Sequence, residues 1–143
     1  MNILEIGIII FVFIEMLNII TLYYMPEQKR GNGIGVFNAF ERSKEDEEMH
    51  NFVTYLIDWI AGAKIIFVMI GIVIVIFGSF ELQQWTVGAF IISILSFYYK
   101  LYPRIRKMDK NGNISPKGYY KTLNIMIVSF VIMFTVVLII SFL

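Results

Sequence analysis

Residues 65–77 read IIFVMIGIVIVIF, a run of thirteen apolar or small residues without a charge or a proline. The apolar residues are consecutive, whereas a half-buried β-strand would alternate apolar and polar side chains. Extended toward the amino terminus, the run covers about 52–77, and roughly 20 helical residues are enough to cross a hydrocarbon layer of about 30 Å. Because every backbone amide must be hydrogen-bonded within lipid, this stretch predicts a membrane-spanning α-helix.

Three further apolar runs of similar length lie elsewhere in the chain, and Pro26 and Pro103 directly follow two of them. Hydrophobic residues make up 58% of the chain, above the roughly 45–50% apolar content of globular proteins. We therefore expect an all-α integral membrane protein in which residues 1–143 form a single membrane domain. The expected four-transmembrane-helix bundle has its spans at about 3–25, 52–77, 82–102 and 119–143.

Lysine and arginine are distributed unevenly around these runs. Eleven of the twelve lie in or beside the expected loops at about 26–51 and 103–118, and none lies near either terminus or in the connection at about 78–84. Basic residues accumulate on the cytoplasmic side of membrane proteins. We therefore expect cytoplasmic loops and both termini outside (N-out/C-out). The 27 isoleucines suit lipid-facing helices and an AT-rich genome, which favours a bacterial cytoplasmic (plasma) membrane.

The first loop contains three local patterns. Residues 31–35 (GNGIG) predict a flexible hinge, because glycine reaches backbone angles that other residues avoid. Residues 36–40 (VFNAF) are typical of a short amphipathic segment that lies in the membrane interface. Ser43 and Asp46 have the spacing of a capping box, which predicts that the second helix begins near Lys44.

Charged and polar side chains also occur inside the expected spans. The first and second expected helices cross the membrane in opposite directions, and Glu15 and Lys64 therefore lie at similar depths. We expect them to pair because a lone charge at the bilayer centre costs at least ~2.5–3.5 kcal/mol. Asn18 lies one turn from Glu15 and can hydrogen-bond across the helix interface. Asp58 lies about 120° around the helix from Lys64. It is nearer the cytoplasmic boundary and is expected to meet tyrosines, loop arginines or water.

Three interpretations of these intramembrane residues remain open. Glu15, Asn18 and Lys64 can form a neutral, hydrogen-bonded clamp that determines how two helices pack. Alternatively, the residues line a transport or proton-relay pathway, as ionisable groups within membranes often do. In the third interpretation, Lys64 extends its long aliphatic stem toward an interface.

The two loops differ in net charge. The first loop, through Asn51, has four basic and six acidic residues, whereas the second and its edges have seven basic and one acidic. The basic residues can hold anionic lipid headgroups, each contact worth about 1 kcal/mol near a membrane surface, or contact a protein partner. Alternatively, the acidic run 45–48 docks against basic residues of the second loop. The candidate contact residues are Lys29, Arg30, Arg104, Arg106, Lys107 and Lys110.

The sequence contains no catalytic motif such as a nucleophile elbow, a zinc-protease helix or a P-loop. Cysteine is absent, which excludes disulfides and thiolate metal sites. We therefore expect no enzyme activity, cofactor, metal or nucleic-acid partner. The expected partners are the lipid bilayer and either further copies of the chain or a larger membrane protein.

Two functions agree with these features. The favoured one is an accessory or scaffold subunit of a membrane complex. The alternative is a homo-oligomeric transporter or channel for a small solute or ion, in which Glu15, Asn18, Asp58 and Lys64 line the route, because four helices rarely enclose a pathway alone.

Overall fold

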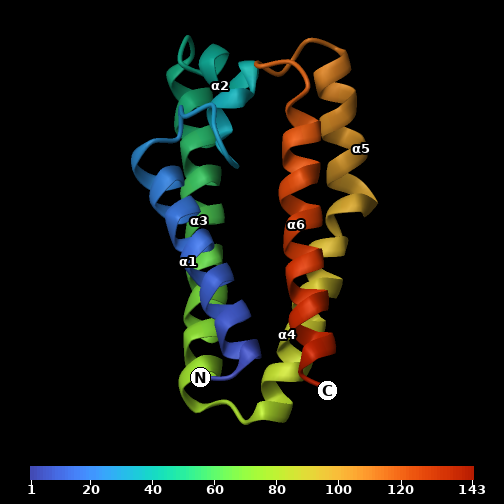
Figure 1. Cartoon of the computed structure of the whole chain (residues 1–143). Helices are drawn as coiled ribbons and strands as arrows, with labels where there is room; N and C mark the ends of the chain where they lie inside the picture. The colour runs from blue at the N-terminus through green and yellow to red at the C-terminus, as the bar shows by residue number, and fades with distance from the viewer.

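The computed structural model describes all residues from 1 to 143 and consists of helices joined by loops and turns, with one isolated β-bridge. Two helical hairpins stand side by side (Figure 1). The first pairs α1 with α3, and the second contains α4, α5 and α6. The elements are α1 (Ile3–Tyr24), η1 (Ile34–Val36), α2 (Asn38–Ser43), α3 (Glu47–Phe77), α4 (Phe80–Leu95), α5 (Phe97–Lys110) and α6 (Tyr119–Ile140).

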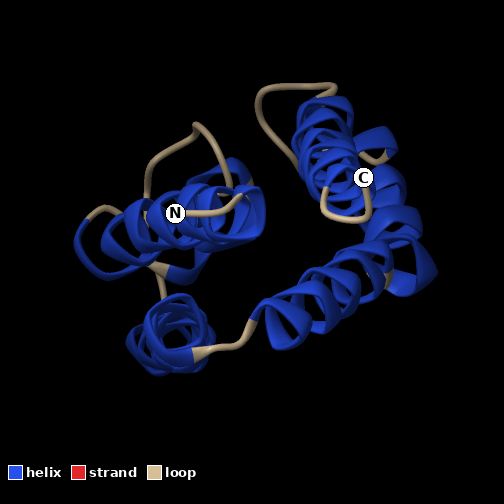
Figure 2. Ribbon diagram, turned by 60° about the horizontal axis from the view of Figure 1, so that its bottom comes forward, coloured by secondary structure: helices blue, strands red, loops and turns tan.

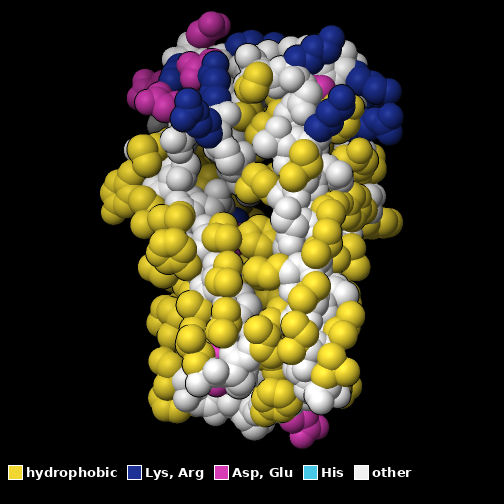
Figure 3. Space-filling view, in the orientation of Figure 1, with side chains coloured by type: hydrophobic (Ala, Val, Ile, Leu, Met, Phe, Trp, Pro, Cys, Tyr) yellow, Lys and Arg dark blue, Asp and Glu magenta, His cyan; other side chains and the backbone are white.

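The two ends of the molecule differ in what they carry. Both termini and the turn between α3 and α4 lie at one end, here called the termini end (Figure 1). The loops at 25–46 and 111–118 lie at the other end, called the loop end. Figure 2 shows the turn after α3 joining the two hairpins at the termini end. The basic residues therefore collect at the loop end, as Figure 3 shows.

Three helices, α1, α3 and α6, are long and apolar enough to cross a membrane. Much of their apolar surface faces outward, since the exposed fraction is 62% for Phe13, 62% for Phe67 and 57% for Ile132. Contiguous apolar surface on this scale is unusual for a water-soluble monomer. Figure 3 shows it as a broad apolar belt below the charged loop end. This surface is typical of a membrane protein.

The predicted third helix at about 82–102 is divided in the structure. Helix α4 has 16 residues and ends at Leu95, and α5 begins at Phe97 and continues to Lys110. At the break, the Ser96 hydroxyl donates to the carbonyl of Ser93 over 2.6 Å, and serine side chains that bond to the preceding turn commonly bend helices. The prediction that this helix ends before Pro103 is wrong, because Pro103 lies within α5.

The first loop folds over the loop end and contacts the protein itself. Val36 is fully buried against Ile105, Ile114 and Tyr119, and Phe40 joins the main core between the helices. The prediction that residues 36–40 form an interfacial segment is therefore wrong for these two side chains. Their apolar surface is removed from solvent by the second hairpin and the bundle core, which leaves little to insert into lipid.

The start of α3 also differs from the prediction. Ser43 does not cap α3; it is the last residue of α2, and its hydroxyl donates to the carbonyl of Phe40 over 2.7 Å. Asp46 is the N-cap instead, and its carboxylate accepts the Met49 N–H at 3.0 Å. Helix α3 therefore begins at Glu47, three residues later than the capping-box pattern predicted, and the predicted cap Ser43 belongs to α2.

Helix α5 ends at Lys110, and Asn111 and Gly112 form its C-terminal cap. Gly112 has a φ of +74°, a left-handed conformation that glycine adopts without strain. The next amide, of Asn113, donates to the carbonyl of Met108 over 3.0 Å, as in a Schellman helix cap. The chain then turns back toward the first loop.

The two loops are joined by a set of hydrogen bonds, here called the clasp. Phe37 and Ile114 form the isolated β-bridge. Beside it, the Asn38 side chain donates to the carbonyl of Gly112 over 2.9 Å. The clasp further comprises the bonds Ser115 N–H to Val36 O (2.8 Å), Asn38 N–H to Asn113 O (3.0 Å) and Tyr119 Oη–H to Gly31 O (2.7 Å). It connects the hairpins across the loop end.

Candidate functional site: an ion pair beside a cleft

Glu15 on α1 and Lys64 on α3 form an ion pair in which the Lys64 ammonium donates to a Glu15 carboxylate oxygen. About a fifth of each side chain is exposed, 22% for Glu15 and 23% for Lys64. Both residues lie in helices that are able to cross a membrane. The pairing predicted from their equal depths is therefore present in the structure.

Close packing of α1 on α3 brings the pair together. Ala61, one turn before Lys64, is fully buried, and a side-chain carbon built on Gly71 would lie only 2.7 Å from Val12 Cγ2 of α1. Small residues of this kind let two helix backbones approach closely. Because the two helices lie so close, the carboxylate of Glu15 and the ammonium group of Lys64 can reach each other.

Asn18 does not join the ion pair. Its amide nitrogen donates to the carbonyl of Asn32 in the first loop over 3.5 Å, and its buried amide oxygen has no hydrogen-bond partner. Asn18 is therefore not part of a hydrogen-bonded clamp with Glu15 and Lys64. Asn18 instead faces the glycine-containing loop that folds over the end of α1.

Asp58 is also separate from the site. Its side chain is exposed on α3 and makes no hydrogen bond or ion pair. It therefore forms no hydrogen bond or ion pair with the tyrosines or loop arginines expected beside it. The structure thus brings together two of the four intramembrane candidates, Glu15 and Lys64.

A cleft of about 470 Å³ lies between the two hairpins in the half of the molecule nearer the loop end. The ion pair lies on the first hairpin's side of it, and Ser93, Ser96 and Arg104 lie on the opposite side. Residues of the first loop, between 32 and 37, contribute to its lining at the loop end. The break at Ser96 lies on the cleft, so the change of direction from α4 to α5 contributes to its shape.

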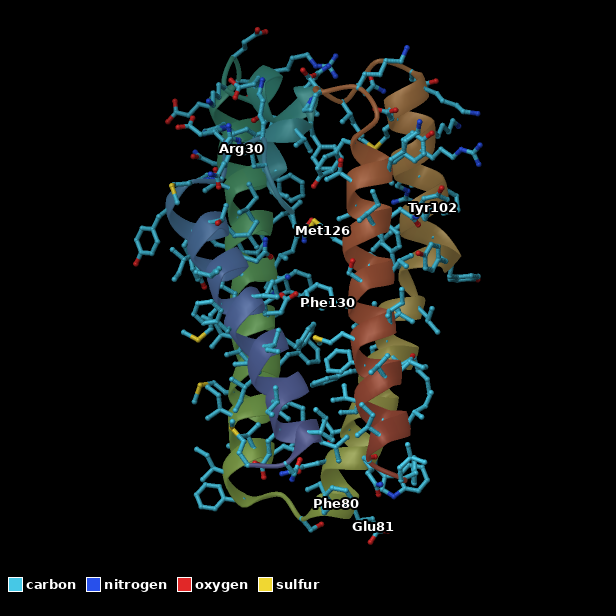
Figure 4. The ribbon with its side chains drawn as sticks, in the orientation of Figure 1. Arg30, Phe80, Glu81, Tyr102, Met126 and Phe130 are labelled. Atoms are coloured by element: carbon cyan, nitrogen blue, oxygen red, sulfur yellow. The ribbon has the colours of Figure 1, made fainter.

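The cleft does not continue to the termini end. Phe11, Phe90, Phe130 and Phe134 pack together there with ring centroids 5.1–5.5 Å apart, and Phe134 is fully buried. Figure 4 shows Met126 and Phe130 pointing from α6 into the space between the hairpins. The aromatic cluster thus fills the interior between the cleft and the termini end.

The charged residues of the loop end remain largely unpaired. Arg104 makes no ion pair or hydrogen bond, and the acidic run 45–48 makes no ion pair with α5. The acidic run 45–48 therefore does not dock onto the basic residues of α5 within one chain. The candidate contact residues Lys29, Arg30, Arg104, Arg106, Lys107 and Lys110 are all exposed.

One charged network does form in the first loop. Lys44 pairs with Glu41 at 3.1 Å and with Glu27 at 3.3 Å. These hydrogen bonds, first that to Glu41 and then that to Glu27, raise the pKa of the Lys44 ammonium above its ordinary value. The network links the chain just after α1 to α2.

A polar cluster at the termini end was not predicted from the sequence. Gln83 is 1% exposed, and its amide accepts from Asn2 at 2.7 Å and donates to Glu5 and to the carbonyl of Gly78, each over 3.3 Å. Asn2 and Glu5 form a reciprocal capping box, whose spacing could have been recognised in the sequence. Gln83 lies 78 positions after Glu5 in the sequence, so no local pattern indicated it as the third member.

The arrangement is therefore an ion pair beside a cleft that is closed toward the termini end, below a charged surface whose side chains mostly form no ion pairs. No protein-family model, no curated protein and no solved structure matches this chain.

Proposed function

We propose that this chain is a four-span protein of a bacterial cytoplasmic membrane that serves as an accessory or scaffold subunit of a larger membrane complex. In this arrangement α1, α3 and α6 cross the membrane, and α4 with the first turns of α5 makes the fourth crossing. The loop end then faces the cytoplasm and both termini face outside, in agreement with the enrichment of basic residues at the loop end.

The observation that carries the accessory function is a pair of charged clusters at the loop end that form no ion pairs with each other. Acidic side chains 45–48 lie at the start of α3 and basic side chains lie along α5, on different hairpins and without mutual ion pairs. Figure 3 shows acidic side chains, with basic ones beside them, on one side of this end and a mainly basic group on the other. Opposed charged patches of this kind orient a protein partner and accelerate its association.

The interior supports a structural role for the ion pair. Glu15 and Lys64 neutralise each other within one chain, and the phenylalanine cluster fills the space between them and the termini end. A single chain therefore offers no continuous polar route from one end to the other.

Co-purification from the organism's own membranes tests this proposal. Mild-detergent extraction is expected to retain a larger membrane protein in fixed stoichiometry. The triple variant Glu45→Gln, Glu47→Gln, Glu48→Gln should lower its recovery, and Glu81→Gln at the termini end should not. A homogeneous assembly of this chain alone would contradict the accessory role.

The cleft favours a second candidate, a homo-oligomeric transporter or channel. An ion pair beside a cavity that is closed toward one end resembles a solute site that is accessible from one side. Glu15→Gln distinguishes the two functions. For a transport site, the reconstituted variant should remain folded and lose flux, whereas for a structural clamp it should lose thermal stability in detergent. Glu81→Gln, which is exposed at the termini end and outside the cleft, is the matched control.

A further inference from the structure

The cleft between the hairpins has the size and lining of a ligand site. Its volume of about 470 Å³ lies within the roughly 300–1,000 Å³ typical of small-molecule pockets. Most lining side chains are apolar, among them Ile60, Ile94, Phe97, Leu101 and Ile127. The interior of the cleft therefore suits a flexible hydrocarbon chain.

The cleft opens sideways, onto the apolar belt. Figure 3 shows a hollow at mid-height between the hairpins, bordered by apolar side chains and lying below the basic side chains of the loop end. If the belt lies in a membrane, such an opening faces acyl chains, and the basic residues lie near the headgroups. A lipid can enter it by lateral diffusion, whereas a water-soluble solute would have to cross the belt.

Charge determines which lipid suits the cleft. Glu15 and Lys64 neutralise each other, which leaves Arg104 as the one unbalanced charge in the lining. Lys100 and Lys107 lie four residues before and three residues after Arg104, so the three residues form a stripe along one side of α5. Guanidinium groups bind phosphate through two parallel hydrogen bonds.

We propose that the cleft binds one anionic phospholipid, with an acyl chain between the hairpins and the headgroup phosphate on Arg104, flanked by Lys100 and Lys107. This inference rests on the membrane arrangement proposed above, but it requires no protein partner. It assigns the basic stripe of α5 to a specific lipid and the cleft to that lipid's chain.

Native mass spectrometry of the delipidated full chain tests the headgroup contact. The probes are phosphatidylglycerol and phosphatidylcholine with identical acyl chains. We expect one bound phosphatidylglycerol, held about fivefold more tightly than phosphatidylcholine. Arg104→Gln should remove this preference. Arg106→Gln removes the same charge from the same helix, about 200° around its axis and outside the cleft, and should retain it.

Two tryptophan variants test the position of the acyl chain. Ile127→Trp places a large side chain in the cleft and should reduce lipid retention at least tenfold. Ile125→Trp places the same side chain two residues away on α6, at a position that is 65% exposed and outside the cleft lining, and should leave retention unchanged. The thermal unfolding of each variant confirms that it is folded.

Three results would overturn the proposal. The first is an equal loss of the phosphatidylglycerol preference in Arg104→Gln and Arg106→Gln, which would indicate general attraction to a basic helix. The second is equal retention of both lipids by the unmodified chain. The third is unchanged lipid retention in Ile127→Trp. Labelling of single cysteines introduced at Lys117 and Glu81, in a chain without cysteine, reports separately on the membrane arrangement. If this lipid selectivity is found but no protein partner co-purifies from native membranes, the accessory role is contradicted and the lipid site stands.

Discussion

At the scale of single residues, the Glu15–Lys64 ion pair makes the largest demand on the surrounding structure. Removing two charges from water is costly, and their attraction offsets that cost only while both partners are present. Removing one partner leaves an uncompensated charge among apolar side chains. The pair thus constrains which variants fold, even where its net contribution to stability is small.

Replacing Lys64 with methionine should expose this constraint. We expect Lys64→Met to lower the free energy of unfolding by about 3 kcal/mol, the low end of the range for a buried pair, since part of each side chain is exposed. Adding Glu15→Gln should recover most of the loss, because the double variant is neutral. Thermal unfolding in detergent measures both. A double variant no more stable than Lys64→Met would contradict the explanation.

At the scale of the elements, the contact between α1 and α3 depends on a missing side chain. Gly71 faces Val12 so closely that a methyl group would lie 2.7 Å from it, whereas a methyl group on Gly88 of α4 would meet no atom within 4 Å. The two glycines have the same propensity within a helix and differ in their neighbours. Their comparison therefore isolates helix packing from helix propensity.

We expect Gly71→Ala to destabilise the protein by about 1–3 kcal/mol, the usual cost of overpacking. Gly88→Ala should be neutral or slightly stabilising, because alanine favours helix more than glycine does. Both are measured by the same detergent unfolding assay. Equal effects of the two substitutions would show that the α1–α3 contact adapts to the added methyl group.

The clasp between the loops provides a second test at this scale. Tyr119→Phe removes the hydroxyl that bonds to Gly31 and should speed amide hydrogen exchange over residues 31–38, while costing about 1 kcal/mol of stability. The Tyr120 hydroxyl makes no hydrogen bond, although its ring packs 6.2 Å from that of Tyr102. Tyr120→Phe should therefore leave exchange unchanged. Faster exchange in both variants would argue against the hydroxyl contact.

At the scale of the whole molecule, the two hairpins are joined firmly at the termini end and more openly toward the loop end. Gln83 ties α4 to the start of α1 and the end of α3, and the phenylalanine cluster fills the adjoining interior. Beyond Ser96 the cleft separates the hairpins, and at the loop end the clasp and the small apolar cluster around Val36 bridge them. Movement of one hairpin against the other would therefore begin at the loop end.

Gln83→Leu should weaken the contact between the hairpins at the termini end. The substitution keeps the side chain large but leaves the partners Asn2 and Glu5 without the amide, which we expect to cost about 1–3 kcal/mol. Glu81→Gln, on the same turn and exposed without hydrogen bonds, should have no effect on unfolding. A fully stable Gln83→Leu protein would show that the phenylalanine cluster alone holds this end.

The sequence by itself determined the helical class, the length and apolar character of α1, α3 and α6, and the pairing of Glu15 with Lys64. Each of these follows from local composition and helix rise, which need no knowledge of neighbours. Only the tertiary structure decided the bond from Asn18 to the first loop, the clasp and the cleft. Those features arise where segments far apart in the chain compete for the same apolar surface and hydrogen-bonding groups, and that competition leaves no periodic pattern in the sequence.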